Sequence, residues 1–476
     1  MSSTEVLAIV LAAGQGTRMK SETPKVLHEI AGKPLVAWAV DAALEAGMTR
    51  AVVVVGHGGE RVETSLRARF GDRVSFALQA EQKGTGHAVR CAMDTLPGYE
   101  GRVVILYGDC PLLSAATIRE LVTASTGAKL GLLTAHITDP TGYGRILRDD
   151  TGRVRAIREH KDASLEERAI HEVNPGVYCI DAGFLRSAIA TLDTNNAQGE
   201  LYLTDVVEAA ARQGSVVDVE GDMAELRGVN DRYELALCAK IRRAKLVEAL
   251  ARSGVGVADP DTLHVDADCI VEPDAWLGAN VHLRGRTVVR RGARIDVGSV
   301  LTDVEVAENA LVKPYSVAEK SVIGPSAEVG PFSHLRPETE LGPKAKVGNF
   351  SETKKTKIGA RSKVPHLAYV GDGILGEDVN VGAGTIFCNY DGYRKHTTVL
   401  EDGVFIGSDS QLVAPIRVGK GAYVGSGTTV TKDVPAGALA ISRPKQENKE
   451  GMADKLRARM EAAKKADQAK KSGSPG

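Results

Sequence analysis

Aromatic residues are scarce in this chain of 476 residues, and its net charge is close to zero. Phe, Trp and Tyr together make up 4% of the sequence, whereas glycine occurs 51 times, and this imbalance indicates a glycine-punctuated repeat. The formal net charge of -1 argues against general nucleic-acid binding, because affinity for a phosphate backbone needs clustered and uncompensated Lys and Arg. Any anionic substrate must therefore be met by local groups.

Cysteines are few, and long hydrophobic runs are missing. The six cysteines are scattered without a CxxC pair, so the sequence predicts neither a disulfide framework nor a zinc site and favours a reducing cytosol. The start, MSSTEVLAIVLAAG, has no basic residues before its short apolar run, and no other run approaches the ~20 apolar residues of a membrane span. We expect a cytoplasmic protein without membrane insertion.

The length predicts two or three domains, because one hydrophobic core stops growing below this size. Up to about residue 230, β-branched apolar runs such as VLAIVL, AVVVVG and RVVILYGD alternate with helical patterns. This alternation predicts an α/β doubly wound, Rossmann-like domain over 1–230, with ligands beyond the carboxyl ends of the strands. Apolar residues at helical spacing followed by Ser253-Gly254 predict a linker helix over 231–253.

From about 262 to 437 the aliphatic period changes to six. Guide residues recur every sixth position, as at Ile323, Val329, Leu335, Leu341 and Val347, and glycine often follows them. Hexapeptide repetition is typical of a parallel β-helix, here over 254–442, whose guide residues stack inward. The stretch between 381 and 406 is too long for a tight corner and predicts a projecting loop. Residues 443–476 are rich in Lys, Arg and Ala and predict a basic, mostly disordered tail.

The first strand leads into a glycine-containing loop that suits a phosphate. In AAGQGTRM, residues 12–19, two glycines let backbone amides approach an anion, while Arg18 and, after Pro24, Lys25 supply positive charge. A bare GxG also suits a tight strand-to-helix turn, and Asp109 after the run VVILY also suits a helix cap. The local pattern alone leaves both interpretations open.

The longer string resembles a known signature. LAAGxGTRM followed by PK is similar to the nucleotidyltransferase signature of sugar-1-phosphate pyrophosphorylases, as are the glycines of QKGTGHA and the aspartate of LYGDCPL. The blocks DPTGYGRI, IREHKDA, EVNPG, NNAQGELYLTD and GVN narrow the resemblance to one family. That family is the bifunctional N-acetylglucosamine-1-phosphate uridylyltransferases and glucosamine-1-phosphate acetyltransferases, the GlmU family, and the resemblance covers about residues 5–450.

The resemblance implies synthesis of UDP-N-acetylglucosamine, a cell-wall precursor, with UTP, glucosamine-1-phosphate, N-acetylglucosamine-1-phosphate and acetyl-CoA as substrates. Arg18 and Lys25 are implied as catalytic cations on the phosphates, and Asp109 and Asn230 as ligands of Mg²⁺. The implied nucleotide and UDP-sugar contacts are Leu11, Ala12, Ala13, Gly14, Lys25, Gln79, Gly84, Thr85, Tyr107, Gly108, Asp109, Gly144, Glu159, Asn174 and Asn230. Pro175 departs from the small residue usual in the family, so we expect a slight shift of the backbone at Asn174.

The second half resembles the acetyltransferase of the same family. His366 is implied as the catalytic base, although a lone histidine in a repeat corner is often structural, and we expect Glu352 to orient it. The implied glucosamine-phosphate contacts are Arg336, Lys354, Tyr369 and Asn380, and the implied acetyl-CoA contacts are Ala383, Asn389, Tyr390, Ser408, Ser426 and Arg443. Ser426 departs from the family's alanine. The resemblance also implies a left-handed helix and a homotrimer with sites between neighbouring helices.

Two rival interpretations compete with a bifunctional enzyme. The first is a single-activity nucleotidyltransferase, making for instance ADP-glucose or a dTDP-sugar, whose β-helix only regulates or assembles. This interpretation does not explain His366 and Lys354 in the second half of the chain. The second is a non-enzymatic assembly factor that kept both folds, and the intact Gly14, Arg18, Lys25, Asp109 and Asn230 count against it.

Overall fold

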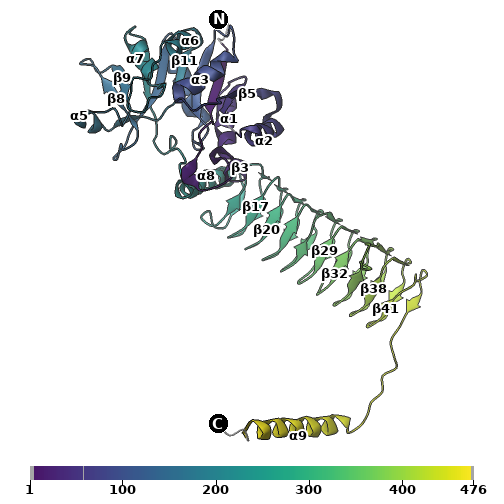
Figure 1. Ribbon diagram of the computed structural model, residues 1–476. Coiled ribbons are helices and arrows are strands. Elements are labelled where there is room, and N and C mark those ends of the chain that lie inside the picture. Colours follow the sequence, from purple (N-terminus) through teal and green to yellow (C-terminus); the bar gives the residue numbers. More distant parts are fainter. Residues whose placement is uncertain (1–4, 57, 473–476) are drawn as a thin grey trace. The chain divides into compact units, whose positions relative to one another are not determined.

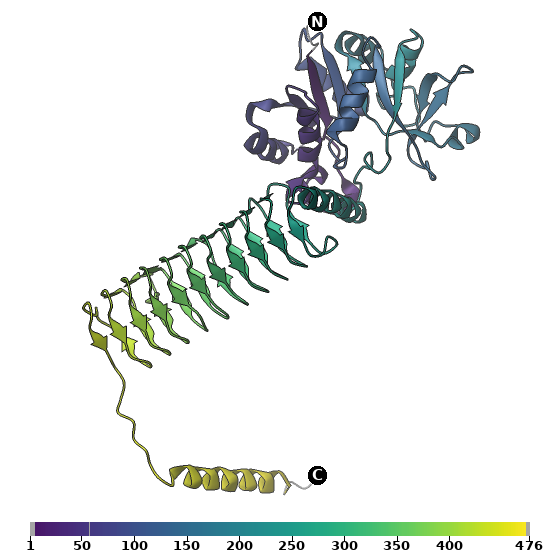
Figure 2. The same ribbon diagram turned by 180° about the vertical axis from the view of Figure 1, so that it is seen from behind.

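A computed structural model describes residues 5–56 and 58–472, which form two compact units divided between residues 319 and 320. The first unit holds an α/β domain, the long helix α8 and the first coils of a β-helix (Figures 1 and 2). The second unit holds further coils of the same kind and the terminal helix α9. The division by contacts therefore falls within the repeat region and not at the predicted linker helix.

A mixed sheet forms the centre of the α/β domain, in the order β5-β4-β1-β6-β11-β7-β10-β8-β9, with β12 paired to β7. The strands from β5 to β6 are parallel, whereas β11 pairs antiparallel with both β6 and β7. The strands are β1 (Val6–Leu11), β4 (Ala51–Val55), β5 (Val74–Leu78), β6 (Arg102–Tyr107), β7 (Leu130–His136), β8 (Gly144–Arg148), β9 (Val154–Arg158), β10 (Glu172–Asn174), β11 (Tyr178–Asp181) and β12 (Val216–Glu220), with a separate ribbon of β2 (Glu29–Ile30) and β3 (Lys33–Pro34). The predicted α/β domain is confirmed, with an antiparallel outer half.

Helices pack on both faces of this sheet, because successive strand residues point to opposite sides. On β1, Ala8 and Val10 join the core under α1, α2 and α4, whereas Leu7 and Ile9 join the core under α3, α6 and α7. The helices are α1 (Leu35–Glu45), α2 (Glu60–Phe70), α3 (Thr85–Asp94), α4 (Ala115–Ala124), α5 (Leu165–Arg168), α6 (Ala182–Ala190) and α7 (Asp205–Ala211), with short turns η1 (Thr17–Met19), η2 (Lys25–Leu27) and η3 (Gly71–Arg73). Burial on both faces explains the continuous apolar runs of the parallel strands.

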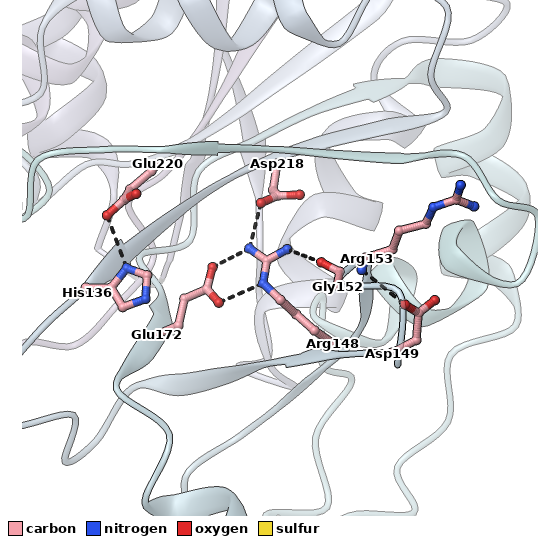
Figure 3. Close-up of polar contacts among 8 residues, drawn as sticks. All are labelled: His136, Arg148, Asp149, Gly152, Arg153, Glu172, Asp218 and Glu220. Carbon is pink, nitrogen blue, oxygen red and sulfur yellow. Dashed lines mark hydrogen bonds and ion pairs between the residues drawn. The ribbon is translucent and has the colours of Figure 1, made fainter.

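An ion-pair network ties together the outer strands (Figure 3). Arg148 on β8 donates Nε and Nη2 to the two carboxylate oxygens of Glu172 on β10, at 2.9 and 2.5 Å, and Nη2 also to Asp218 on β12 at 2.6 Å. His136 on β7 lies 3.1 Å from Glu220 on β12. Because Glu172 is buried, its bidentate pairing with Arg148 compensates the loss of hydration. The network fixes β8 and β10, which also carry candidate sugar-site residues.

Helix α8 (Arg232–Arg252) lies within the range 231–253 expected for a linker helix. Asp231 caps it by accepting a hydrogen bond from the backbone N–H of Glu234 at 2.8 Å. Its buried Cys238 packs into a small core with the loops after β1 and β6. The helix ends before Gly254, whose φ of +99° suits the change of direction into the first coil.

Parallel strands wind around three flat sides in both units, as a left-handed β-helix of hexapeptide repeats requires. In the first unit the sides are β13 (Gly256–Val257), β16 (Trp276–Leu277), β19 (Arg294–Ile295) and β22 (Leu311–Val312); β14 (His264–Val265), β17 (His282–Arg284), β20 (Val300–Thr302) and β23 (Val317–Glu319); and β15 (Ile270–Val271), β18 (Val288–Val289) and β21 (Glu305–Val306).

In the second unit the first side is β25 (Glu328–Val329), β28 (Lys346–Val347), β31 (Lys363–Val364), β34 (Asn380–Val381), β37 (Phe405–Ile406), β40 (Tyr423–Val424) and β42 (Leu439–Ala440). The second is β26 (His334–Leu335), β29 (Glu352–Lys354), β32 (Tyr369–Gly371), β35 (Ile386–Cys388), β38 (Gln411–Val413) and β41 (Thr429–Val430). The third is β24 (Val322–Ile323), β27 (Thr339–Leu341), β30 (Thr356–Ile358), β33 (Gly373–Leu375), β36 (Thr398–Leu400) and β39 (Ile416–Val418).

The guide residues of the six-residue period form the inner column of these coils. Ile323, Val329, Leu335 and Val347 have no solvent exposure, and Leu341 has 3%. Each coil buries its aliphatic residues against the next, so stability comes from the stack. The predicted hexapeptide β-helix is confirmed.

The tail differs from the sequence prediction. Residues 452–472 form helix α9 (Met452–Ser472), where a mostly disordered arm was expected, and the described side chains of this helix are exposed. Its many Ala, Lys, Arg, Glu and Met residues have high intrinsic helix propensity, which favours a helix without burial. A segment too polar to form a hydrophobic core can therefore still form a helix.

Two absences bear on the sequence expectations. In the part of the chain that the structure describes, no helix has both the length and the apolar character required to cross a membrane. The cysteines at 91, 110, 179, 238, 269 and 388 are free thiols, consistent with the expected lack of a disulfide framework.

Candidate active sites

A cavity of about 300 Å³ opens at the carboxyl ends of β1 and β6. These strands are parallel neighbours in register, with Leu11 opposite Tyr107, so the loops that follow them meet at one edge. The N–H of Gly108 donates to the carbonyl of Leu11 at 2.9 Å and holds the loops together, although Gly108 itself lines no part of this cavity. The predicted residues on its wall are Leu11, Ala12, Ala13, Gly14, Lys25, Gln79, Gly84, Thr85, Tyr107 and Asp109.

The far wall of this cavity is built around a glycine that no other residue can replace. Gly84 has φ of +99°, and a Cβ there would lie 2.6 Å from the carbonyl oxygen of Leu201. The buried side chain of Gln79 donates Nε2 to the carbonyl of Gly84 at 3.1 Å. Thr85 then begins α3 and accepts the N–H of Leu203 at 3.2 Å. The wall therefore presents fixed amide groups beside an apolar surface.

Two cation–oxygen pairs lie near Asp109, and the pair of Lys25 and Asp109 is on the wall of this cavity. Lys25 Nζ lies 2.5 Å from Asp109 Oδ2, and Arg18 Nη2 donates to Asn230 Oδ1 at 2.8 Å. The N–H of Val229 donates to the backbone carbonyl of Asp109 at 2.9 Å, which brings residues 109 and 230 to the same place. The structure thus joins the predicted phosphate cations directly to the predicted Mg²⁺ ligands.

The donor set of Asp109 and Asn230 fits Mg²⁺. Asp109 offers a carboxylate and Asn230 an amide oxygen, both hard oxygen donors on the wall of one cavity. Mg²⁺ typically binds through one or two such protein ligands and completes its coordination with water and substrate phosphates. Among the described residues no group of three or more His, Cys, Asp or Glu side chains forms a protein-only metal cage.

A second cavity, of about 480 Å³, shares Tyr107 and Asp109 with the first. The other predicted residues on its wall are Arg18, Gly144, Glu159, Asn174 and Asn230. Because the two cavities share a wall at Asp109, a ligand in one can meet a ligand in the other there. The sequence analysis missed Gln82 and Glu200 in the first cavity and Thr141, Tyr143 and Glu234 in the second. The first four are isolated loop residues without a pattern, and Glu234 lies in the first turn of α8, where an acidic residue is common.

Polar groups in the second cavity are held in fixed orientations. Asn174 donates Nδ2 to Tyr178 Oη at 2.7 Å and accepts the N–H of Gly176 at 3.0 Å, so its amide is fixed from both sides. The intervening Pro175 lies on the wall without breaking these contacts. Glu159 accepts a hydrogen bond from Thr204 Oγ1 at 3.2 Å, and burial raises the pKa of its carboxyl.

A cationic face lies on adjacent coils of the second unit. Lys354 ends β29 opposite Gly371 of β32, and the N–H of Arg336 donates to the carbonyl of Thr353 at 2.8 Å. The ammonium group of Lys395, followed by the guanidinium of Arg336, lowers the pKa of Lys354. Three cations therefore converge on this face. Lys395 was missed because its position depends on the folding of the projecting loop.

His366 lies at the turn before β32, and its neighbour is an asparagine. Its Nδ1 lies 2.6 Å from Oδ1 of Asn349, one coil earlier. An amide oxygen only accepts, so the neutral imidazole carries its proton on Nδ1 and leaves the Nε2 lone pair available. The expectation that Glu352 orients His366 is wrong, because Glu352 forms an ion pair with Arg336, Oε1 to Nη1 at 2.7 Å. Glu352 begins β29 and meets the residue that follows β26 in the preceding coil, not the turn that carries His366.

The remaining predicted residues lie further along the same unit. The carbonyls of Ala383 and Ser408 accept the N–H groups of Asp409 and Gly427, at 2.7 and 2.8 Å, so these residues stack in successive coils. Tyr369 and Asn380 begin β32 and β34, while Asn389 and Tyr390 begin the projecting loop, where Asn389 Nδ2 donates to Asp372 at 2.6 Å. Arg443 donates to the backbone carbonyl of Ser426. Because this contact uses the backbone, it is the same whether position 426 holds serine or the alanine usual in the family.

The fold and the two sites define a nucleotidyltransferase joined to a hexapeptide-repeat transferase. Residues 8–171 match the MobA-like NTP transferase domain, and residues 397–432 match the bacterial transferase hexapeptide of six repeats. The chain is 56% identical over 470 residues to the bifunctional protein GlmU of Sorangium cellulosum, covering 97% of this chain and 99% of the relative. It is 48% identical over 451 residues to that of Pelobacter propionicus, covering 94% and 97%. The chain belongs to the GlmU family.

Proposed function

We propose that this chain makes UDP-N-acetylglucosamine by acetylating glucosamine-1-phosphate from acetyl-CoA and then transferring UMP from UTP to the acetylated sugar phosphate. The observation that carries the proposal is the presence of two separate cationic sites on two different folds. One joins Arg18 and Lys25 to oxygen ligands at the carboxyl ends of parallel strands. The other places Arg336 and Lys354 on a face of the β-helix.

Uridylyl transfer in the first unit requires positioning more than acid–base chemistry. A phosphate oxygen of N-acetylglucosamine-1-phosphate attacks the α-phosphorus of UTP, and the bond to pyrophosphate breaks. The attacking oxygen is already anionic, so no protein nucleophile is required. The nucleotide lies in the cavity with Gln79, and the sugar lies in the cavity with Glu159 and Asn174. Arg18 and Lys25 neutralise the charge that develops at the phosphates.

Asp109 and Asn230 would hold Mg²⁺ at the wall shared by the two cavities. The ion supplies charge neutralisation for the phosphates when it is bound. The residues themselves set its place: Lys25 pairs with Asp109 and Arg18 with Asn230, so both oxygen ligands are held before substrate arrives. Departure of either cation toward a substrate phosphate leaves an oxygen ligand for the metal.

Acetyl transfer in the second unit requires a proton acceptor. The amine of glucosamine-1-phosphate attacks the thioester carbon, a C–N bond forms, the C–S bond breaks, and the CoA thiolate takes a proton. Nε2 of His366 removes the proton from the amine, with Asn349 fixing the opposite ring nitrogen. Arg336, Lys354 and Lys395 bind the substrate phosphate, Tyr369 and Asn380 contact the sugar, and the remaining predicted residues line the acetyl-CoA groove.

A reconstitution tests the two activities together. The purified protein is incubated with glucosamine-1-phosphate, acetyl-CoA, UTP and Mg²⁺, and nucleotide sugars are measured by ion-exchange chromatography. UDP-N-acetylglucosamine is expected only when all four are present, and added N-acetylglucosamine-1-phosphate should replace the first two. Nucleotide-sugar formation without acetyl transfer would favour the rival single-activity enzyme.

We also propose a homotrimer that forms through an apolar column on the β-helix. Phe332, Phe350 and Leu367 occupy the same turn of successive coils with 49, 57 and 60% of their surface exposed, and the two phenyl rings stack at 5.5 Å. An exposed apolar column of this kind indicates a protein interface, and a second copy of the chain is the occupant that the family resemblance implies. The column lies beside His366, so a neighbouring copy would meet the acetyl-transfer site.

Phe350→Lys is expected to weaken association of the subunits at least about 30-fold, the effect of losing an aromatic hot-spot residue, and to reduce acetyl transfer as the trimer dissociates. The substitution keeps the local backbone, because Lys344 already takes positive φ at a neighbouring turn. Size-exclusion chromatography with light scattering measures the assembly, and uridylyl transfer should be unchanged. Leu165→Lys, at a residue 85% exposed on α5, is the control. A trimeric and fully active Phe350→Lys protein would disprove the proposed interface.

A further inference from the structure

A second cationic cluster lies in the first unit, where α8 contacts the first coils. His264 of β14 and His282 of β17 are paired in register, and their rings stack at 4.3 Å with an interplanar angle of 4°. Arg243 of α8 lies against this stack, with Nη1 3.2 Å from Nε2 of His264. A cavity of about 410 Å³ opens beside them. None of these residues belongs to either proposed active site.

More positive charge surrounds the stacked rings. Lys240 lies three residues before Arg243 on α8, a spacing that puts both side chains on one face, and both line the cavity. Arg284 ends β17, two residues after His282. In the described part of the chain no carboxylate forms an ion pair with the side chain of Lys240, Arg243 or Arg284.

The pKa shifts of the two imidazoles show that positive charge acts on both rings. Burial lowers the pKa of His264, and the positive charges of His282, Arg243 and Arg284 lower it further. Burial also lowers the pKa of His282, with Arg284 and Arg243 adding to the effect. No carboxylate opposes these shifts. Near neutral pH the rings therefore stay uncharged within a positive field.

The one acidic group on the described cavity wall is already engaged. Asp266 accepts the N–H of Gly285 at 2.9 Å through Oδ2. Its carboxyl lies so close to Gly32 that a Cβ there would approach within 2.6 Å. Burial raises the pKa of Asp266, whereas the hydrogen bond from Gly285 and the positive charge of Arg284 lower it, so this carboxylate offsets part of the charge of Arg284.

We propose that this cluster is a binding site for the phosphate group of a small molecule. Arg243 supplies forked N–H donors suited to phosphate oxygens, Lys240 supplies a further charge on the same cavity wall, and Arg284 adds positive charge from outside that wall. With His264 Nε2 accepting from Arg243, its Nδ1 carries a proton that can be donated. A cavity of this size takes a group larger than a bare phosphate ion, so a phosphate monoester is the expected class. The site does not depend on the proposed function of the two active sites.

Ring signals of the two histidines give a test specific to this cluster. The Cε1–H resonances of His264 and His282 in the full-length, histidine-labelled protein are assigned with His264→Asn and His282→Asn, and followed during titration with inorganic phosphate and with glucose 6-phosphate. Both resonances should shift as the phosphate compound is added, with half of the full shift at about 1 mM. Tighter binding of glucose 6-phosphate assigns the site to a monoester, and equal or tighter binding of inorganic phosphate assigns it to the free ion.

Charge-removing variants complete the test. The double variant Arg243→Gln with Arg284→Gln keeps side-chain donors but removes two charges, and should weaken binding at least tenfold. Arg286→Gln removes the same charge two residues away, on the wall of another cavity, and should change nothing. If the double variant does not fold, Lys240→Gln takes its place, with a threefold loss expected. Wild-type resonances that do not move, or a folded double variant that binds as tightly as wild type, would overturn the proposal.

Discussion

Asp109→Ala is expected to reduce uridylyl transfer by about 10³-fold or more while acetyl transfer stays at the wild-type rate. The variant removes one of two protein oxygens proposed for Mg²⁺ and leaves Lys25 without the carboxylate that lies 2.5 Å from its Nζ. Electrostatic stabilisation of developing charge is commonly the largest single contribution to such transfers, which is the reason for the size of the effect. The residues proposed for acetyl transfer all belong to the second unit, so this change should not affect them.

Two assays on one preparation separate these activities. Pyrophosphate release from UTP and N-acetylglucosamine-1-phosphate reports uridylyl transfer, and free thiol release from acetyl-CoA reports acetyl transfer. Asp94→Ala, at an exposed carboxylate that ends α3, is the matched control and should behave as wild type. If both activities fell together in a folded Asp109→Ala protein, the assignment of separate sites would be wrong. Retained pyrophosphate release would remove Asp109 from the reaction.

The repeat region was predictable because its signal is local and periodic. A six-residue period fixes which aliphatic residues point inward, and residues such as Ile323 and Val329 are fully buried as expected. The antiparallel pairing of β11 with β6 and β7 was not predictable, because strand direction depends on contacts between segments far apart in sequence. The hand of the β-helix likewise came from the family resemblance and not from the period.

The candidate sites show the same division. The glycine loop after β1 could be found because its signature is continuous; its Ala12, Ala13 and Gly14 line the first cavity, and its Arg18 lines the second. Glu352 was expected as the partner of His366 because carboxylates commonly orient catalytic histidines. The coil is seventeen residues long here, and Asn349, one coil before His366, is the partner instead. Counting one coil back would have found it. The coil period does not predict the position of Lys395, because its loop is held by hydrogen bonds within the loop itself.

The loop that carries Lys395 shows why such residues escape a periodic analysis. Tyr390 and Lys395 form an antiparallel bridge, and the N–H of His396 donates to the carbonyl of Asn389 at 2.8 Å. His396 Nε2 also lies 2.7 Å from Asp391 Oδ2. These contacts close a hairpin outside the coil repeat, so the direction of Lys395 follows from the hairpin alone.

Removal of the imidazole of His366 is the sharpest test of the second site. His366→Ala should lower acetyl transfer by about 10²–10⁴-fold, the usual contribution of a general base, with uridylyl transfer unchanged. His366→Asn keeps polarity and comparable bulk but accepts no proton near neutral pH, so it should be impaired similarly. Thiol release from acetyl-CoA measures the rate of each variant.

The position of Asn349 separates catalysis from packing. If His366 is the base and Asn349 fixes its tautomer, Asn349→Ala should lower turnover less than loss of the imidazole does and should leave thermal stability nearly unchanged, because the side chain is not part of the buried column. His171→Asn, at an exposed histidine of the first unit, is the control and should leave both activities intact. If the histidine only fills a corner between coils, His366→Ala should lower the melting temperature instead, and His366→Asn should retain most of its turnover. A folded His366→Asn trimer with wild-type acetyl transfer would place the proton acceptor elsewhere.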